Sequence, residues 1–123
     1  MPLTLLEAIS REEGFGIPGK RATRNNNPCD LEFKPWETAF DAVLETIPAG
    51  YEEEPRFACF PTPEAGFAAA RALLTKDYLG LTIQQFVAKF APSSENNVQA
   101  YVAALCEMCG VTAETVVTAE LVG

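Results

Sequence analysis

Short apolar stripes with helical spacing, each bounded by a capping residue or a glycine, constrain this chain more than any other feature of its sequence. In the first stripe, Thr4 and Glu7 form a capping box, in which each side chain satisfies a free backbone N–H of the first turn. Apolar side chains then recur on one face until Gly14, a residue type that commonly ends a helix. The pattern predicts a helix over residues 4–13.

The second half of the chain contains four more stripes of this kind. Each lies behind residues that favour the start of a helix, such as threonine, proline or asparagine. The predicted helices begin at Thr62-Pro63-Glu64, at Leu81-Thr82, at Val98 (ending at Cys109 before Gly110), and at Thr112, the last one fading near Leu121.

The pattern between these two regions is mixed. Residues 14–34 are rich in Gly, Pro and Asn and predict a long loop, in which 31–33 form a short strand. Residues 36–47 carry apolar side chains at helical spacing and predict one amphipathic helix, and 57–60 predict another short strand. We therefore expect residues 1–123 to form a single α+β domain, mostly helical, with a small β element after the first helix.

The composition permits a folded domain and excludes several kinds of partner. Of the 123 residues, 48% are hydrophobic, which is enough to bury a core without a metal or a disulfide. The formal net charge of −8 disfavours nucleic acid, because non-specific binders neutralise phosphates with Lys and Arg. No apolar run approaches the roughly 18–20 residues of a membrane span, and the first residues lack the basic start of a signal peptide. We expect a monomer, made in the cytoplasm, that binds neither nucleic acid nor the interior of a membrane.

The sequence contains no histidine, and this removes several mechanisms at once. Ser–His–Asp and Cys–His hydrolases are excluded, as are zinc sites built on histidine. The cysteines are interpreted as buried small hydrophobes, with a disulfide or a four-cysteine zinc site as weaker alternatives. They are Cys29, Cys59, Cys106 and Cys109. Carboxylates remain as the candidates for catalysis, and no metal or cofactor is expected.

Two motifs near the N-terminus resemble the front of phage and prophage lysozyme-like proteins. They read Arg11-Glu12-Glu13-Gly14-Phe15-Gly16 and Arg24-Asn25-Asn26-Asn27-Pro28. Together with similar segments further on, among them 90–97, the resemblance covers residues 5–34 and 57–118. It implies the lysozyme superfamily fold and cleavage of the β-1,4 bond between MurNAc and GlcNAc in peptidoglycan. Residues 35–56 fall outside it and are interpreted as a specificity insertion or a lid.

Glu13 is the candidate general acid and base. A glycosidic oxygen must be protonated as it leaves, so the acid must keep its proton near neutral pH, which burial against apolar side chains favours. Glu13 matches the Glu-Gly step of the resembled group and follows Ile9 by four residues, on the inward stripe. Glu12 is the competing candidate and lies about 100° around the helix. A solvated glutamate at a helix end is the alternative interpretation.

The resembled proteins use two mechanisms, which differ in whether a second carboxylate takes part. Hydrolytic glycosidases use a second carboxylate at about 5–9.5 Å, and phage lysozymes of one type place an Asp about nine residues after the Glu. Residues 20–24 hold no Asp here, although Asp30 and Glu32 follow later. This favours a lytic transglycosylase, in which one Glu protonates the leaving oxygen and then activates an internal sugar hydroxyl. The resembled group usually continues its Asn-Asn-Pro with Gly-Asn, whereas this chain has Cys29-Asp30.

Polar side chains in two loops are the candidate sugar contacts, each with a structural alternative. The asparagines either bind sugar hydroxyl and acetamido groups or shape their loop, Glu95 also suits a first helical turn, and Tyr101 also suits a core. The predicted contacts are Asn25, Asn26, Asn27, Ser94, Glu95, Asn96 and Tyr101. The expected partner is the glycan strand of peptidoglycan, reached after delivery by a phage or a secretion system. The rival hypothesis is a non-catalytic peptidoglycan-binding or virion structural module.

Overall fold

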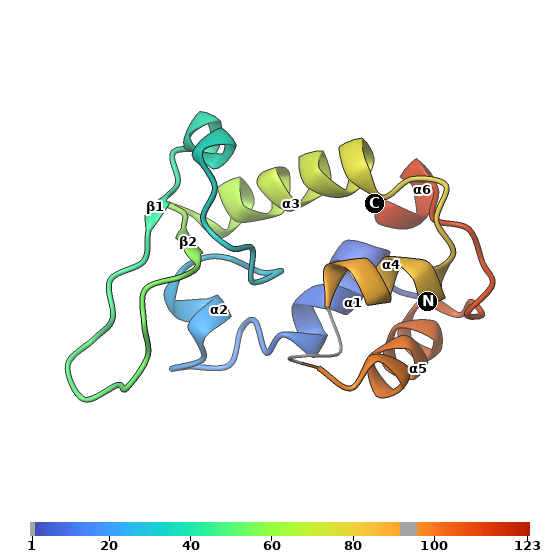
Figure 1. The fold of residues 1–123 in the computed structure, drawn as a ribbon, viewed down its shortest axis with the longest axis horizontal. Helices are drawn as coiled ribbons and strands as arrows, with labels where there is room; N and C mark the ends of the chain where they lie inside the picture. Colours follow the sequence, from blue (N-terminus) through green and yellow to red (C-terminus); the bar gives the residue numbers. More distant parts are fainter. Residues whose placement is uncertain (1, 92–95) are drawn as a thin grey trace. The chain divides into compact units, whose positions relative to one another are not determined.

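A computed structural model describes residues 2–91 and 96–123. The chain forms two compact units: the helical unit comprises Met1–Glu12 and Arg71–Gly123, and the mixed unit comprises Glu13–Ala70. The elements follow one another along the chain as α1 (Leu5–Glu12), α2 (Arg21–Arg24), the 3₁₀ helix η1 (Pro35–Phe40), β1 (Val43–Leu44), β2 (Ala58–Cys59), α3 (Pro63–Asp77), α4 (Ile83–Phe90), α5 (Val98–Cys109) and α6 (Ala119–Val122) (Figure 1). The predicted mostly helical α+β class is confirmed, and the single domain stays a prediction.

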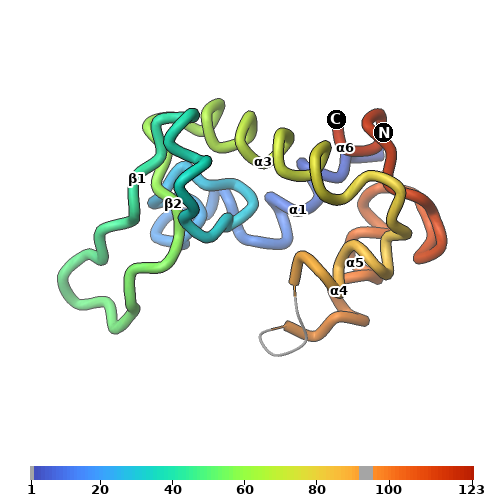
Figure 2. Tube along the Cα trace, turned by 45° about the horizontal axis from the view of Figure 1, so that its top comes forward, coloured from blue at the N-terminus to red at the C-terminus, as the bar shows by residue number. Residues whose placement is uncertain are grey.

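In the helical unit, α1 packs on α5 and α6, and α4 packs on α5. The expected capping box is present in α1, where Glu7 Oε1 accepts from Thr4 N and Glu7 N donates to Thr4 Oγ1. The start of α4 is capped in the same way by Thr82, and Gly110 ends α5 in a left-handed conformation. The chain's last residue, Gly123, lies against Thr4, so the two ends meet (Figure 2).

The last predicted helix is wrong over most of its length. Thr112 donates its backbone N–H to Thr115, but no helix continues from this turn. The segment runs extended instead, and Val116 pairs with Thr82 through a β-bridge. Only α6 is helical, and Thr118 caps it. The β-branched residues of this segment favour extended backbone over helix, which explains the difference.

In the mixed unit, a two-stranded antiparallel sheet follows the N-terminal loops. Val43 pairs with Cys59, and Leu44 pairs with Ala58. The predicted strand at 57–60 is thus confirmed as β2, whereas the predicted strand at 31–33 is reduced to a single bridge between Glu32 and Phe57. The short helix α2 lies within the segment that was predicted to be loop.

The predicted helix over 36–47 is wrong beyond its first half. The 3₁₀ helix ends at Phe40 because Asp41 adopts a left-handed conformation with φ 62°. The next residues form β1, so Val43 and Leu44 are exposed rather than facing a core. Glu45, which follows them, is only 3% exposed. A buried carboxylate inside the segment is the physical reason for the strand, as shown below.

Gly66 brings the first turn of α3 against the backbone of the asparagine loop. A Cβ built at this position would lie 2.2 Å from the carbonyl oxygen of Asn26 and 2.7 Å from Cδ of Pro28. No side chain fits at such distances, so this position requires glycine. The close approach holds the loop that carries the candidate site.

Candidate active site

Asn27 fixes the shape of the asparagine loop from inside. Its side chain is fully buried, and its Nδ2 donates to the carbonyl oxygens of Leu31 and Ala58, both at 2.9 Å. Its Oδ1 accepts from the backbone N–H of Leu31 at 3.0 Å. These bonds join the loop to β2 and leave Asn27 no exposed surface for a sugar. In this conformation its contacts are those of the loop-shaping alternative.

The two neighbouring asparagines also direct their amides into the protein. Asn25 is buried and donates Nδ2 to the carboxylate of Glu45 at 3.0 Å. Asn26 is half-buried, has a left-handed backbone with φ 49°, and donates Nδ2 to the carbonyl oxygen of Phe60 at 3.1 Å. Asn26 is therefore the member of the triplet with surface left for a ligand. A sugar contact by any of them stays a prediction.

A tight turn after Asn27 presents Asp30. The backbone N–H of Asp30 donates to the carbonyl oxygen of Asn27 at 3.1 Å. The left-handed residue of this turn is Asp30, with φ 49°, while Cys29 is buried. Asp and Asn tolerate this backbone region better than most residues do. Cys29 therefore does not disrupt the turn, although the resembled proteins usually have glycine there.

The carboxyl group of Asp30 lies against that of Glu13. Glu13 directly follows the last residue of α1, is half-buried, and shares a side-chain hydrogen bond with Asp30. Burial and then the charge of Glu13 raise the pKa of Asp30 to about 8. A hydrogen bond between two carboxyl groups needs one proton, so this pair retains a proton at neutral pH. We call Glu13 and Asp30 the carboxyl pair.

Cys29, the residue before Asp30, is buried close enough to the carboxyl pair to be affected by its charge. Burial, and then the charges of Glu13 and Asp30, raise the pKa of its thiol far above the ordinary value. The thiol therefore stays protonated and neutral. It acts as a small buried hydrophobe next to the pair, in keeping with the interpretation of the cysteines from sequence. All four cysteines have free thiols in this structure.

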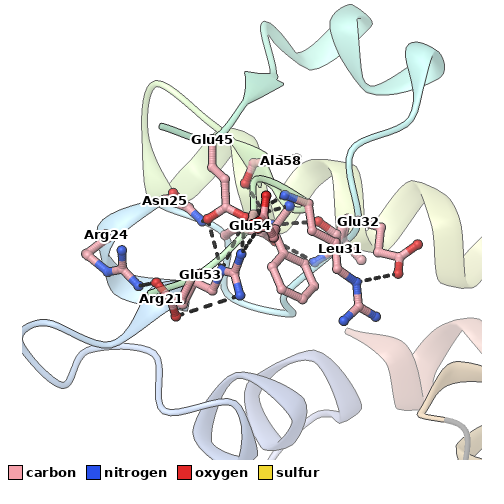
Figure 3. Close-up of polar contacts among 12 residues, drawn as sticks. Arg21, Arg24, Asn25, Leu31, Glu32, Glu45, Glu53, Glu54 and Ala58 are labelled. Atoms are coloured by element: carbon pink, nitrogen blue, oxygen red, sulfur yellow. Dashed lines mark hydrogen bonds and ion pairs between the residues drawn. The ribbon is translucent and has the colours of Figure 1, made fainter. Parts of the chain in front are cut away.

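A second carboxylate in this unit, Glu45, sits in the opposite electrostatic environment (Figure 3). Arg21 donates to it from Nε at 3.0 Å and from Nη2 at 2.7 Å. The backbone N–H groups of Arg56 and Phe57 donate to its Oε2 at 2.9 and 2.7 Å. Burial alone would raise the pKa of Glu45, but bonds from Arg21, Asn25 and the two N–H groups outweigh it and hold the pKa at about 2. We call Arg21, Asn25 and Glu45 the arginine cluster.

Three consecutive glutamates occupy residues 52–54, and one of them is paired with an arginine. Glu53 is half-buried and pairs with Arg24 at 2.8 Å, and the guanidinium of Arg24 stacks over the ring of Tyr51 at 4.3 Å. Arg21 also donates to the carbonyl oxygen of Glu54 at 2.6 Å. These contacts tie the segment between β1 and β2 to α2. Arg21 and Arg24 thus anchor both ends of the stretch 45–54 to α2.

The remaining predicted contacts lie outside the mixed unit. Ser94 and Glu95 are outside the described residues. Asn96 is half-buried, and Tyr101 lies on α5 with 5% of its surface exposed. Tyr101 is therefore part of the core of the helical unit, which matches the structural alternative for this residue.

Two features of the site were not singled out from the sequence. Asp30 was named only as a later carboxylate, and its contact with Glu13 depends on a turn closed by backbone bonds. Glu45 looked like one polar residue within a helical stripe. A signal was available for Glu45, because a lone Glu between Leu44 and Ile47, downstream of Arg21 and Arg24, suits a buried ion pair.

One more buried carboxyl lies apart from these groups. Glu37 in η1 is fully buried and accepts a hydrogen bond from the backbone N–H of Lys34. Burial raises the pKa of Glu37 to about 7, and its Oε2 has no hydrogen-bond partner among the described residues.

Across residues 2–91 and 96–123, no group of three or more Cys, Asp or Glu side chains is arranged to hold a metal ion.

No protein-family model matches this chain, and no curated protein matches it either. Within the described ranges, none of the helices has both the length and the apolar character needed to cross a membrane. The carboxyl pair is therefore the main evidence for a function.

Proposed function

We propose that this chain has a lysozyme-like fold and cleaves peptidoglycan glycan strands at the β-1,4 bond between MurNAc and GlcNAc. Glu13 acts as general acid and base, and no cofactor is required. Support comes from the order of elements, in which α1 ends at the acid and a small antiparallel sheet follows it. The motifs around Glu13 and Asn25-Asn26-Asn27 support the same assignment.

The observation that carries this proposal is the side-chain hydrogen bond between Glu13 and Asp30, beside a buried oxygen of Asp30 that has no partner among the described residues. General acid catalysis works best when the acid is protonated near the working pH. Glycosidases reach this state by placing a carboxyl in surroundings that disfavour its charge. Here the burial of Asp30 and its contact with Glu13 have that effect. Arg24 pairs with Glu53 at 2.8 Å.

The spacing of the two carboxyls favours a lytic transglycosylase over a hydrolase. Retaining hydrolases separate their carboxyls by about 5–5.5 Å and inverting ones by about 6.5–9.5 Å, which leaves room for a sugar or a water. Glu13 and Asp30 are joined by a hydrogen bond, so neither space exists between them. The nucleophile is then a hydroxyl of the substrate itself, and the product has a 1,6-anhydro end. The enzyme works as a monomer after a phage or a secretion system delivers it to the wall.

Digestion of purified sacculi by the wild-type protein and Glu13→Gln tests this proposal, with the released muropeptides identified by mass spectrometry. Anhydro ends from the wild type alone are expected. Reducing ends would instead indicate a hydrolase. Binding of both proteins to sacculi without any release would overturn the enzyme and support the rival, a non-catalytic binding or virion structural module.

A further inference from the structure

The backbone holds the side chain of Asp30 in place against Glu13. Asp30 follows a turn closed by its own N–H on the carbonyl oxygen of Asn27, at 3.1 Å. The next residue, Leu31, is fixed on both sides by the side chain of Asn27. These bonds fix the backbone of Asp30 and of its neighbour, and so place the carboxyl of Asp30 next to Glu13.

One oxygen of Asp30 gives a second, independent indication. Oδ1 is buried and has no hydrogen-bond partner within the described part of the chain. Burying an unpaired oxygen costs much less for a neutral carboxylic acid than for a carboxylate. This surrounding therefore favours the protonated form of Asp30, with its O–H donated to Glu13.

We propose that Asp30 is a positioning residue that shares one proton with Glu13, so that the pair, rather than Glu13 alone, is the acid and then the base of the reaction. This inference rests on the proposed function of Glu13. It assigns Asp30 a role different from that of the second carboxylate of a glycosidase, because it acts through Glu13 and does not reach the sugar.

The step balances with one proton. The proton moves from Asp30 to Glu13 along their hydrogen bond, and Glu13 transfers it to the glycosidic O4 of the leaving sugar as the C1–O4 bond breaks. The empty pair then holds two adjacent negative charges, which makes it a strong base. It takes the proton from the O6 hydroxyl of the MurNAc residue as O6 bonds to C1. The pair ends with the single proton with which it began, and no water enters.

The charged groups around Asp30 agree with this role. Besides Glu13, the charge of Glu45 raises the pKa of Asp30, while Arg21 lowers it. The guanidinium of Arg21 is hydrogen-bonded to Glu45, and its effect on Asp30 is outweighed by burial and by Glu13. The thiol of Cys29, next in the chain to Asp30, is buried and neutral.

Carboxyl ¹³C NMR of the labelled protein, titrated from pH 3 to 10, tests the sharing without any substrate. We expect the Asp30 signal to show an inflection near pH 8, and the Glu13 signal to shift at the same pH because the two groups are coupled. In Glu13→Gln the Asp30 inflection should move to lower pH, and in Asp30→Asn the change near pH 8 should disappear from Glu13. Independent titrations, unaffected by the partner substitution, would overturn the inference.

The pH profile of muropeptide release separates this inference from the proposed function. The wild type should lose activity above about pH 8, and Asp30→Asn should shift that alkaline limb to lower pH and reduce release at least tenfold at pH 8. An active Asp30→Asn with an unchanged profile contradicts the sharing and leaves the function standing. Coupled titration in a protein that releases nothing contradicts the function and leaves the sharing standing.

Discussion

The carboxyl pair and the arginine cluster are two acidic sites that share the asparagine loop, which contributes Asp30 to one and Asn25 to the other, and their surroundings are opposite. Glu45 accepts hydrogen bonds from Arg21, Asn25 and two backbone N–H groups, so its charge is fully compensated. Asp30 faces Glu13, and one of its oxygens has no partner in the described residues. The surroundings of Glu45 therefore favour its charged form, whereas those of Asp30 raise its pKa and favour its neutral form.

The difference separates a structural role from a functional one. A compensated buried ion pair holds three segments together and has no proton to exchange at neutral pH. An uncompensated carboxyl destabilises the fold, and such groups are found mostly where chemistry uses them. Four substitutions test this contrast through the free energy of unfolding, beginning with the largest expected change. An activity assay then tests the proposed role of Glu13.

Glu45→Gln should break the arginine cluster and cause the largest loss. Arg21 would lose its closest anionic partner and keep only the longer contact with Glu53 at 3.7 Å, and breaking such a buried pair costs about 3 kcal/mol. Urea unfolding at pH 7 measures the loss. Glu54→Gln is the matched control, because that side chain is exposed, and it should change stability by less than about 0.5 kcal/mol. Equal effects of the two substitutions would remove the structural role of the cluster.

Gly66→Ala should disturb both sites at once, since the loop backbone carries both. Alanine normally stabilises a helix relative to glycine by about 1 kcal/mol. The clash of the new Cβ with the carbonyl of Asn26 should reverse that sign and cost about 2 kcal/mol. Thermal unfolding gives the sign directly, and a stabilised variant would contradict the close approach of α3 to the loop.

Asp30→Asn should stabilise the protein, in contrast to Glu45→Gln. The pKa of Asp30 is raised from 3.8 to about 8 by folding, so the folded state binds the extra proton between these values and stability falls as pH rises through that window. Asparagine keeps the left-handed turn and can still donate to Glu13. We expect a gain of about 2 kcal/mol at pH 8 and almost none at pH 4. Denaturant unfolding at both pH values measures the difference, and a gain independent of pH would contradict the assignment.

Glu45 should give the opposite pH dependence. Its pKa falls from 4.5 to about 2 on folding, so its contribution is complete above pH 4.5 and is lost as pH falls towards 2. Wild-type stability should therefore rise between pH 2 and 4.5, and Glu45→Gln should remove most of that rise. The same unfolding series, extended to pH 2.5, checks it.

Glu53→Gln should have the smallest effect. Its ion pair with Arg24 is partly exposed to solvent, and such pairs contribute about 0.2–1 kcal/mol. The effect should diminish in 0.5 M salt, unlike that of Glu45→Gln. If Glu53→Gln lost as much stability as Glu45→Gln, the segment between β1 and β2 would be held by the Glu53–Arg24 pair as strongly as by the arginine cluster.

The elements with strong local signals were predicted from the sequence. Capping residues and a closing glycine predicted both ends of α1 and α5 to within a residue, and capping residues predicted the starts of α3 and α4, because these signals act within one turn. The errors at 36–47 and 112–121 arose where long-range pairing overrides helical spacing. In the first, the burial of Glu45 against Arg21 forces a strand, and in the second, a bridge to Thr82 does so.

The candidate site was predicted only in part, for the same reason. Local motifs point to Glu13 and to the asparagine loop, but the inward direction of the Asn25 and Asn27 amides depends on β2 and Glu45, which lie far along the chain. The contact of Asp30 with Glu13 likewise depends on a turn whose closure no spacing rule describes. The sequence therefore pointed to Glu13, and the structure places the carboxyl of Asp30 against it.

The most direct test of the central claim compares Glu13→Gln with Glu12→Gln. Both remove one carboxylate at the end of α1, but Glu12 is exposed, whereas Glu13 is half-buried against Asp30. Initial rates of muropeptide release from sacculi, measured on samples shown to be equally folded, should be near wild type for Glu12→Gln. They should fall at least a hundredfold for Glu13→Gln, as expected for the loss of a general acid and base. Equal rates for the two variants would contradict the assignment of Glu13 as the acid.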